Sequence, residues 1–212
     1  MDNFTIVNKT IFCCAKRNSG KSVLVRDLIR DEKSKFETIF LISPTEEVNE
    51  DFDEVIERQN VFSVYNDEWC GLLVKKMTET NKKKETLQRK HILIVFDDCI
   101  SDVDFHHRNK NIEKIFTRGR HINISCIILS QGVTGVSPVI RRNCDYILCG
   151  QIARKGVDFL CDEYLSGDLT KEEFFKMYER STTDFQFLVI NCTSIKNNCD
   201  LNELYGSIKA NL

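Results

Sequence analysis

The chain has 212 residues, 42% hydrophobic and 29% charged, which is enough apolar material for one well-buried globular domain. Its formal net charge of −2 and sequence pI of 6.1 exclude a global positive field that would draw it onto nucleic acid, so any DNA contact must come from local basic patches. With only two prolines and nine glycines, long linkers are not expected. We expect one domain over residues 1–212, with a core of about 5–192 and a C-terminal extension over 193–212.

Short apolar runs alternate along the chain with stretches of helical periodicity. The runs that predict strands are 5–15 (ending near Cys14), 37–44, 61–65, 91–98, 124–131, 144–151 and 184–192. The stretches that predict helices are 21–34, 46–59, 66–84, about 108–117 and about 154–180. Strands that are apolar on both faces and alternate with helices indicate an α/β fold with a parallel sheet covered on both sides. In such sheets, ligands bind at the carboxyl ends of the strands.

The pattern of the ten cysteines and the sequence of the N-terminus indicate in which cellular compartment the protein is found. The cysteines form no C-x-x-C pair, and most lie in apolar runs such as SCIILS and DYILCG. This pattern favours small buried hydrophobic residues in a reducing compartment over disulfides or zinc ligands. The N-terminus has no signal-peptide pattern, and no apolar run has membrane-spanning length. We therefore expect an intracellular protein without a membrane partner.

The segment after the first predicted strand is typical of a phosphate-binding loop. AKRNSGKS, residues 15–22, fits G-x-x-x-x-G-K-[ST] except that Ala15 replaces the first glycine, and we expect a backbone conformation there that alanine accepts. Lys21 would carry charge to the outer phosphates, and the Ser22 hydroxyl would bind Mg²⁺. The residues predicted to surround a nucleotide are Ala15, Lys16, Arg17, Asn18, Ser19, Gly20, Lys21, Ser22 and Val23. The alternative is an ordinary basic turn.

Two carboxylates follow the strongest predicted strand, in HILIVFDD. Carboxylates at the exit of a buried strand are costly unless they have a partner. Mg²⁺ held by Ser22 and Asp97 would be that partner, and Asp98 would polarise an attacking water. The alternative is a pair of acidic residues that end a strand and cap a turn.

Polar residues also flank the strand predicted over 124–131. Gln131 ends it and could contact the γ-phosphate or the water, although a polar strand end often has no such role. Arg118 and Arg120 precede it on a glycine turn, an arrangement that suits an arginine finger inserted into a neighbour's nucleotide. A solvated basic turn explains the same two residues equally well.

With these four elements in this order, the chain resembles the genome-packaging ATPases of large DNA viruses and their virophage or transposon-like relatives, in the FtsK–HerA division of P-loop motors. The resemblance covers roughly residues 6–192 and depends most on NSGKS, ILIVFDD, FTRGRHINISCIILSQ and SPVIRRNCDYIL. It implies a P-loop NTPase fold of the RecA/FtsK type, with a mainly parallel central sheet flanked by helices on both faces.

The resemblance also implies an activity and partners. The protein would hydrolyse ATP with Mg²⁺ to move double-stranded DNA, independently of sequence, into preformed capsids. It would act as a homo-oligomeric ring (a pentamer or hexamer) that meets capsid or vertex proteins in the host cytoplasm, at the virus factory, or in the virion. Because the chain is short for such a motor, we expect a minimal motor whose partners supply capsid docking. The roles implied residue by residue are metal binding by Ser22 and Asp97, catalysis by Asp98 and Gln131, a trans-acting finger at Arg120 or Arg118, and a nucleotide or interface contact at Arg142.

Two basic segments are candidates for the DNA contact, and two other functions stay open. NKKKETLQRK (81–90) and HHRNK (106–110) could bind backbone phosphates, although such charge runs are often only solvated surface. A nucleoside or nucleotide kinase would share the loop and the sheet, but it usually needs an arginine-rich lid, and 154–180 is acidic and poor in arginine. A non-hydrolysing, nucleotide-gated assembly factor would not need the pair Asp97 and Asp98.

Overall fold

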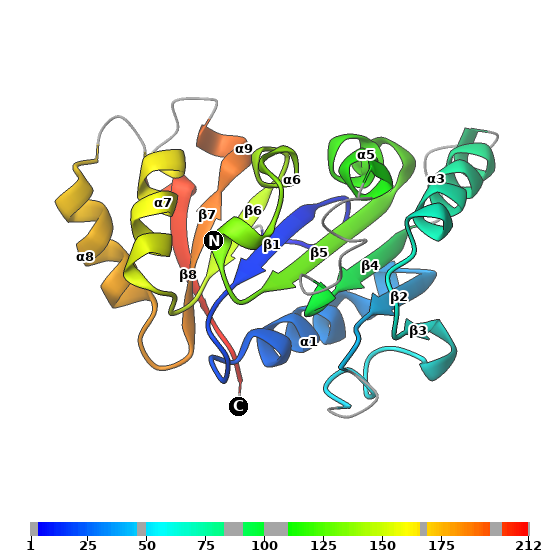
Figure 1. Cartoon of the computed structure of the whole chain (residues 1–212), viewed down its shortest axis with the longest axis horizontal. Coiled ribbons are helices and arrows are strands. Elements are labelled where there is room, and N and C mark those ends of the chain that lie inside the picture. Colours follow the sequence, from blue (N-terminus) through cyan, green and yellow to red (C-terminus); the bar gives the residue numbers. More distant parts are fainter. Residues whose placement is uncertain are drawn as a thin grey trace.

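The computed structural model describes residues 4–45, 50–82, 91–99, 110–165, 169–195 and 201–211. Within these residues the chain forms one eight-stranded sheet with the strand order β3-β2-β4-β5-β1-β6-β7-β8 (Figure 1). The strands are β1 Thr10–Cys14, β2 Thr38–Ile42, β3 Val61–Phe62, β4 Ile92–Phe96, β5 Ile124–Ser130, β6 Tyr146–Cys149, β7 Gln186–Asn191 and β8 Tyr205–Lys209. The helices are α1 Lys21–Glu32, α3 Asp67–Lys82, α5 Lys110–Arg118, α6 Pro138–Arg142, α7 Arg154–Tyr164, α8 Lys171–Ser181, α9 Cys192–Ile195 and α10 Leu201–Leu204.

The pairing pattern confirms the predicted mainly parallel sheet. In sheet order, the first six strands (β3, β2, β4, β5, β1 and β6) pair in parallel. The last two do not, because β7 is antiparallel to β6 and β8 is antiparallel to β7. The central strand β1 lies between β5 and β6, with Cys14 in register with both Ser130 and Cys149. The ends of β1, β5 and β6, and the start of β7, therefore meet at one edge of the sheet, which we call the carboxyl edge.

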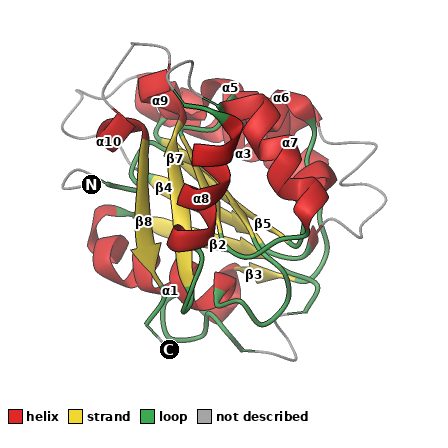
Figure 2. Ribbon diagram, turned by 90° about the vertical axis from the view of Figure 1, so that its left-hand side faces the viewer, coloured by secondary structure: helices red, strands yellow, loops and turns green. Residues whose placement is uncertain are grey.

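Each face of the sheet supports its own hydrophobic core. Phe12 and Cys14 of β1 point into a core shared with α3, α5, α6, α7 and α8, and their strand neighbours Ile11 and Cys13 point into a core shared with α1. This alternation follows from the two-residue side-chain period of a strand. Figure 2 shows the two helical layers on opposite sides of the strands, so helices cover both faces as predicted. No described helix is both long and apolar enough to cross a membrane.

The sequence predicted the positions of β1 to β7 but misplaced part of what lies between them. The helix predicted over 46–59 is wrong for its described part, where residues 51–56 form turns and Arg58–Asn60 a 3₁₀ turn. Phe52, Val55 and Ile56 have helical spacing, and all three are buried in the core that α1 shares, although the segment that carries them is irregular. The helical region predicted over 154–180 is two helices, α7 and α8, and Thr170 and Glu173 form the capping box that starts the second. The strand β8 was not predicted.

The cysteines are buried as expected. Of the nine that the structure describes, eight are buried, Cys192 is half-buried, and all nine are free thiols. Burial raises the pKa of the Cys126, Cys144 and Cys149 thiols well above the usual value, because a thiolate is poorly stabilised in an apolar core. These side chains therefore behave as small neutral hydrophobic residues.

Ala15, which replaces the first glycine of the loop pattern, packs against Gly150, the residue directly after β6. It is fully buried, and its backbone N–H donates to the Ser130 carbonyl over 3.1 Å. Its φ is not among the positive values of the described residues, so alanine is accepted there as predicted. A Cβ added at Gly150 would lie 2.8 Å from the Ala15 Cβ and 2.8 Å from Cε1 of Phe187. The methyl group at position 15 thus occupies the space that a side chain at position 150 would need.

We predict that Gly150→Ala lowers the free energy of unfolding by about 1–3 kcal/mol, because the added methyl overpacks this contact. Ala15→Gly should partly relieve the change, since it removes one of the two opposing groups. Urea unfolding of both single variants and the double variant gives their coupling energy. Strictly additive effects would contradict the packing described here.

Candidate functional site

The predicted phosphate-binding loop connects the end of β1 to the start of α1 at the carboxyl edge. The residue before the helix is Gly20, whose φ of 82° is in the left-handed region that favours glycine. Asn18 also has a positive φ, 56°, and asparagine tolerates it better than most residues. The first N–H groups of α1 have no intrahelical acceptor and carry the positive end of the helix dipole, so the loop is suited to bind an anion.

Lys21 and Asp97 lie on the same side of the molecule. The Lys21 ammonium donates a hydrogen bond to the Lys16 carbonyl within the loop, over 3.3 Å. Burial raises the pKa of the Cys13 thiol strongly, and among the neighbouring charges Lys21 lowers this pKa while Asp97 raises it. Because both charges act on a thiol at the end of β1, the loop lysine and the strand-end carboxylate share one neighbourhood.

The acidic pair and Gln131 are neighbours at the ends of β4 and β5. The Asp97 side chain is buried, and Asp98 is half-buried with a φ of 50°. The Gln131 amide donates to Oδ1 of Asp98 over 3.4 Å, although the two residues are 33 positions apart in the sequence. The left-handed backbone at Asp98 turns the chain sharply at the strand end, and such strain is concentrated at functional sites in proteins.

A cleft of about 490 Å³ opens beside the loop on the β4–β5 side, and we call it the catalytic cleft. Arg17 of the loop lines it together with Asp98 and Gln131. Its other lining residues are Pro44 and Thr45 after β2, and Ser130, Gly132 and Gly135 at the end of β5. Sequence reasoning did not select Pro44 or Thr45, although their position after a predicted strand was a usable signal.

The predicted finger residues lie at the opposite edge of the sheet, where the parallel strands begin. Arg118 and Arg120 precede β5, both exposed, and Nη1 of Arg120 lies 3.8 Å from Oδ1 of the buried Asp145. The seven residues of β5 separate this edge from Gln131, a span of about 20 Å. The arginines are therefore far from the loop of the same chain.

Arg142 lies at the same edge, at the end of α6. Its side chain is 75% exposed, and its Nε lies 3.8 Å from Oε1 of Glu163. The neighbouring Arg141 is buried and contacts the other oxygen of this carboxylate, Oε2, over 3.1 Å. Arg142 thus does not reach the loop of the same chain.

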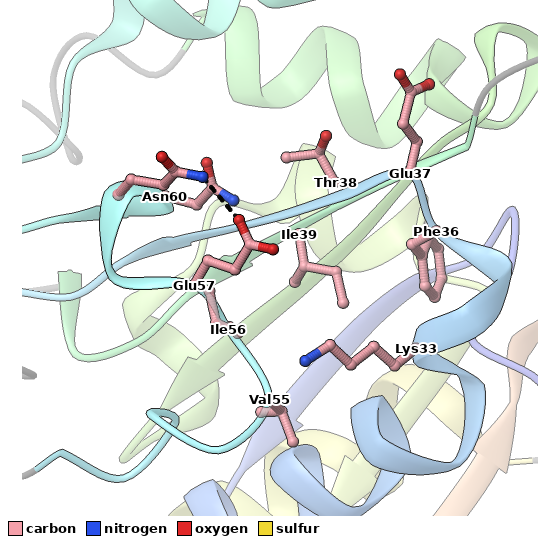
Figure 3. Close-up of a pocket in the computed structure, with 10 residues that line it drawn as sticks. Lys33, Phe36, Glu37, Thr38, Ile39, Val55, Ile56, Glu57 and Asn60 are labelled. Atoms are coloured by element: carbon pink, nitrogen blue, oxygen red, sulfur yellow. Dashed lines mark hydrogen bonds between the residues drawn. The ribbon is translucent and has the colours of Figure 1, made fainter.

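Two further cavities lie among the described residues. One, of about 280 Å³, lies on the other side of the loop, toward β6 and β7, and we call it the second cleft. The other, of about 170 Å³, lies at the start of β2, where Figure 3 shows Lys33 and Glu57 beside the apolar Ile39 and Val55. Glu57 accepts a hydrogen bond from the Gln59 amide over 2.7 Å. This last cavity is at the amino end of the strand, away from the loop.

The basic segments predicted to contact DNA fall mostly outside the described residues. Residues 83–90 and 100–109 belong to these undescribed parts, which leaves only Asn81, Lys82 and Lys110 of the two segments. Asn81 ends up buried, with its amide donating to the Ile122 carbonyl over 3.0 Å.

A mainly parallel sheet, with the phosphate-loop pattern between its first strand and first helix and an acidic pair at the end of β4, one strand beyond the neighbouring β5, defines a P-loop NTPase fold. The match to a family model then identifies the group: residues 6–192 match the Poxvirus A32 protein family, and the chain belongs to it. The predicted resemblance to viral genome-packaging ATPases is thereby confirmed for family and fold.

Solved structures agree on the fold. The genome packaging NTPase B204 from Sulfolobus turreted icosahedral virus 2, in complex with ATP-gammaS, is 14% identical, with a TM-score of 0.62 over 97% of this chain and 98% of that chain. The pCW3 conjugation coupling protein TcpA with ATPgS is 16% identical, with a TM-score of 0.65 over 97% of this chain and 60% of that chain. Among curated proteins, the uncharacterized protein 075L of Invertebrate iridescent virus 6 is 26% identical over 92% of this chain and 76% of its own length.

Two glycines in the loops of the site, Gly20 and Gly132, allow a matched test of the left-handed backbone conformation at Gly20. At Gly20 an alanine would need a left-handed backbone, and its Cβ would lie 3.3 Å from the Ala210 Cβ. At Gly132 the backbone is extended, and nothing lies within 4 Å of an added Cβ. We predict that Gly20→Ala lowers the free energy of unfolding by roughly 1–2 kcal/mol, whereas Gly132→Ala changes it by less than about 0.5 kcal/mol. Urea unfolding measures both, and equal losses would contradict the loop geometry.

Proposed function

We propose that the protein is an ATP-hydrolysing motor that moves double-stranded DNA into preformed viral capsids, with each active site shared between two subunits of a homo-oligomeric ring. The observation that carries the proposal is the division of the predicted residues between two edges of one sheet. The loop, the acidic pair and Gln131 lie together at the carboxyl edge, and the candidate finger arginines lie about 20 Å away at the other edge. Family membership and the NTPase neighbours, solved with ATP analogues, support the nucleotide chemistry.

In this proposal the loop binds the phosphates and its neighbours hold a magnesium ion. Backbone N–H groups at the start of α1 and the Lys21 ammonium face the phosphate oxygens. The Ser22 hydroxyl and the Asp97 carboxylate are hard oxygen donors of the kind that Mg²⁺ prefers, so the donor set fits this ion. When bound, Mg²⁺ neutralises charge that develops on the phosphates.

Asp98 and Gln131 act on the water that attacks the γ-phosphate. The Gln131 amide orients the water, and the Asp98 carboxylate accepts its proton as the oxygen bonds to phosphorus and the bond to the ADP oxygen breaks. Their contact of 3.4 Å lets both side chains reach one water molecule in the catalytic cleft.

Arg120 is the proposed finger, with Arg118 as its neighbour on the same turn. The Asp145 carboxylate 3.8 Å away accepts hydrogen bonds from the backbone and the side chain of Thr10, which fixes its position at the start of β1. This contact orients the guanidinium at the subunit surface, where it can meet the phosphates of a neighbour. An arginine in this role neutralises charge in the transition state.

The remaining parts of the proposal concern the domain, the partners and the location. We propose that residues 1–212 act as one ATPase domain, in a ring of five or six subunits that docks on capsid or vertex proteins. Contact with DNA through backbone phosphates would make binding independent of sequence and sensitive to salt. The site of action would be the host cytoplasm, at the virus factory, or the virion.

The first prediction separates this proposal from its alternatives. Purified protein should release phosphate from ATP faster in the presence of duplex DNA, with a steep dependence on protein concentration, and Lys21→Ala should abolish nucleotide use. Phosphate transfer to a nucleoside without DNA stimulation would instead indicate a kinase. Tight ATP binding without phosphate release by the assembled protein would indicate an assembly factor.

The second prediction tests whether the site is shared between subunits. Arg120→Ala should retain ATP binding but lower turnover by about 10³-fold or more, the scale that arginine fingers supply. Mixing it with Lys21→Ala should restore part of the activity, because the intact loop of one variant can then meet the intact arginine of the other. Phosphate release is measured for each variant alone and for mixtures at constant total protein.

Arg58→Ala is the matched control, since it removes the same charge from an exposed side chain remote from the loop. It should leave turnover unchanged. If Arg120→Ala has unchanged turnover, Arg120 is not the finger, and Arg118 becomes the candidate and is tested in the same way. An absence of recovery in every mixture would refute the shared site.

A further inference from the structure

The second cleft is built by the loop and by two distant turns. Lys16, Asn18 and Ser19 of the loop line one wall, and Gln151, Asp184 and Phe185 belong to the opposite side. Gln151 joins the two walls, because its carbonyl accepts from the Lys16 N–H over 2.7 Å and its side-chain amide donates to the Thr182 carbonyl over 3.1 Å. The cleft therefore opens on the loop with a fixed spacing.

The two clefts flank the loop on opposite sides. Arg17 lines the catalytic cleft, whereas its neighbours Lys16 and Asn18 line the second cleft. A triphosphate bound by the loop, with its γ-phosphate toward Asp98 and Gln131, extends its nucleoside away from that pair. The second cleft is the cavity that lies in this direction.

Phe185 presents an aromatic ring at this position. The residue is 41% exposed, whereas the other aromatic residues that the structure describes are buried or half-buried. Its φ is 58° and that of Asp184 is 51°, two consecutive left-handed residues immediately before β7. Such a conformation costs free energy in residues other than glycine, and strain of this kind is concentrated at ligand sites.

The ring is held next to the phosphate loop. The Phe185 carbonyl accepts from the Ala210 N–H over 3.1 Å, which ties the turn to the end of β8. A Cβ added to Gly20, the one glycine of the loop, would lie 3.4 Å from Cδ1 of Phe185, which is ordinary contact distance. The ring edge is therefore next to the loop backbone. Asp184, the residue before Phe185, forms an ion pair with Lys209 of β8, which also ties this turn to β8.

We propose that the second cleft binds the nucleoside of the bound nucleotide, with the base stacked on the exposed face of Phe185. The proposal rests on the nucleotide-binding function proposed above and adds the residue that recognises the base. Gln186, half-buried in the same wall, carries an amide that can both donate to and accept from the edge of a base. The cavity of about 280 Å³ has room for a planar heterocycle.

The test compares ATP with inorganic tripolyphosphate, which has the phosphates but no base. Base–aromatic stacking contributes enough that Phe185→Ala should raise the dissociation constant for ATP roughly 5- to 150-fold. The dissociation constant for tripolyphosphate should change less than about twofold, because the loop is intact. Lys21→Ala should weaken both ligands, and Leu72→Ala, which shortens an exposed apolar side chain on α3, should weaken neither.

Variants that keep an aromatic ring provide the decisive comparison. Phe185→Trp should retain ATP affinity. Its indole fluorescence should be quenched by ATP, through base stacking, but not by tripolyphosphate. The variant is made in a Trp69→Phe background, which removes the fluorescence of the one native tryptophan. Phe185→Leu, which keeps apolar bulk without the ring, should behave like Phe185→Ala. Thermal unfolding of each variant checks that the fold is kept.

The outcomes separate this inference from the proposed function. If wild-type protein binds both ligands and Phe185→Ala weakens them equally, or weakens neither, base stacking on Phe185 is refuted while nucleotide binding stands. If wild-type protein binds tripolyphosphate and ATP with the same affinity, contacts between the base and the second cleft contribute nothing to the binding free energy, and the inference is refuted. If it binds neither ligand, the proposed nucleotide function itself fails.

Discussion

The parallel pairing of β1 between β5 and β6 is the constraint on which the rest of the structure depends. Because Cys14 is in register with Ser130 and Cys149, the loop after β1 begins at the level where the two flanking strands end. Backbone hydrogen bonds thereby hold segments from distant parts of the chain around the loop. The Ala15 N–H to Ser130 bond and the Lys16 N–H to Gln151 bond extend this ladder into the loop itself. A rigid sheet thus sets the spacing of side chains that no local sequence pattern could hold together.

Backbone strain is distributed unevenly between the two edges of the sheet. Four of the non-glycine residues with positive φ, together with Gly20, surround the loop: Asn18, Asp98, Asp184 and Phe185. The strands end in tight left-handed turns there, whereas the amino edge is held by a buried hydrogen-bonded carboxylate, Asp145, on Thr10. The carboxyl edge therefore carries more of these costly conformations than the amino edge, where Asn8 and Asn123 also have positive φ, and the fully buried strands beneath it supply the stability that maintains them.

The fold was largely predictable from the sequence because its signals are local. The strands β1, β4 and β5 are apolar on both faces, and Asn66, directly before α3, is a residue type typical of a helix start and accepts from the Trp69 N–H. The strand β8 escaped prediction since it is a short edge strand with a glycine and a single buried residue, Tyr205. The helix over 46–59 was wrong because apolar residues of an irregular segment happened to share a helical period. The second cleft could not be predicted, since its walls come from residues 16–19, 151 and 182–186, and only tertiary packing joins them.

The thiols on β1 have a practical consequence for chemical inhibition of this protein. Cys13 and Cys14 are fully buried one and two residues before the loop, on opposite faces of the strand. An alkylating reagent attacks the thiolate, so it can modify them only when the sheet opens. An adduct at either position would then keep β1 from repacking between its neighbours. Loss of activity through modification of Cys13 or Cys14 would thus measure how often the core opens, and it would not identify a cysteine at the nucleotide site.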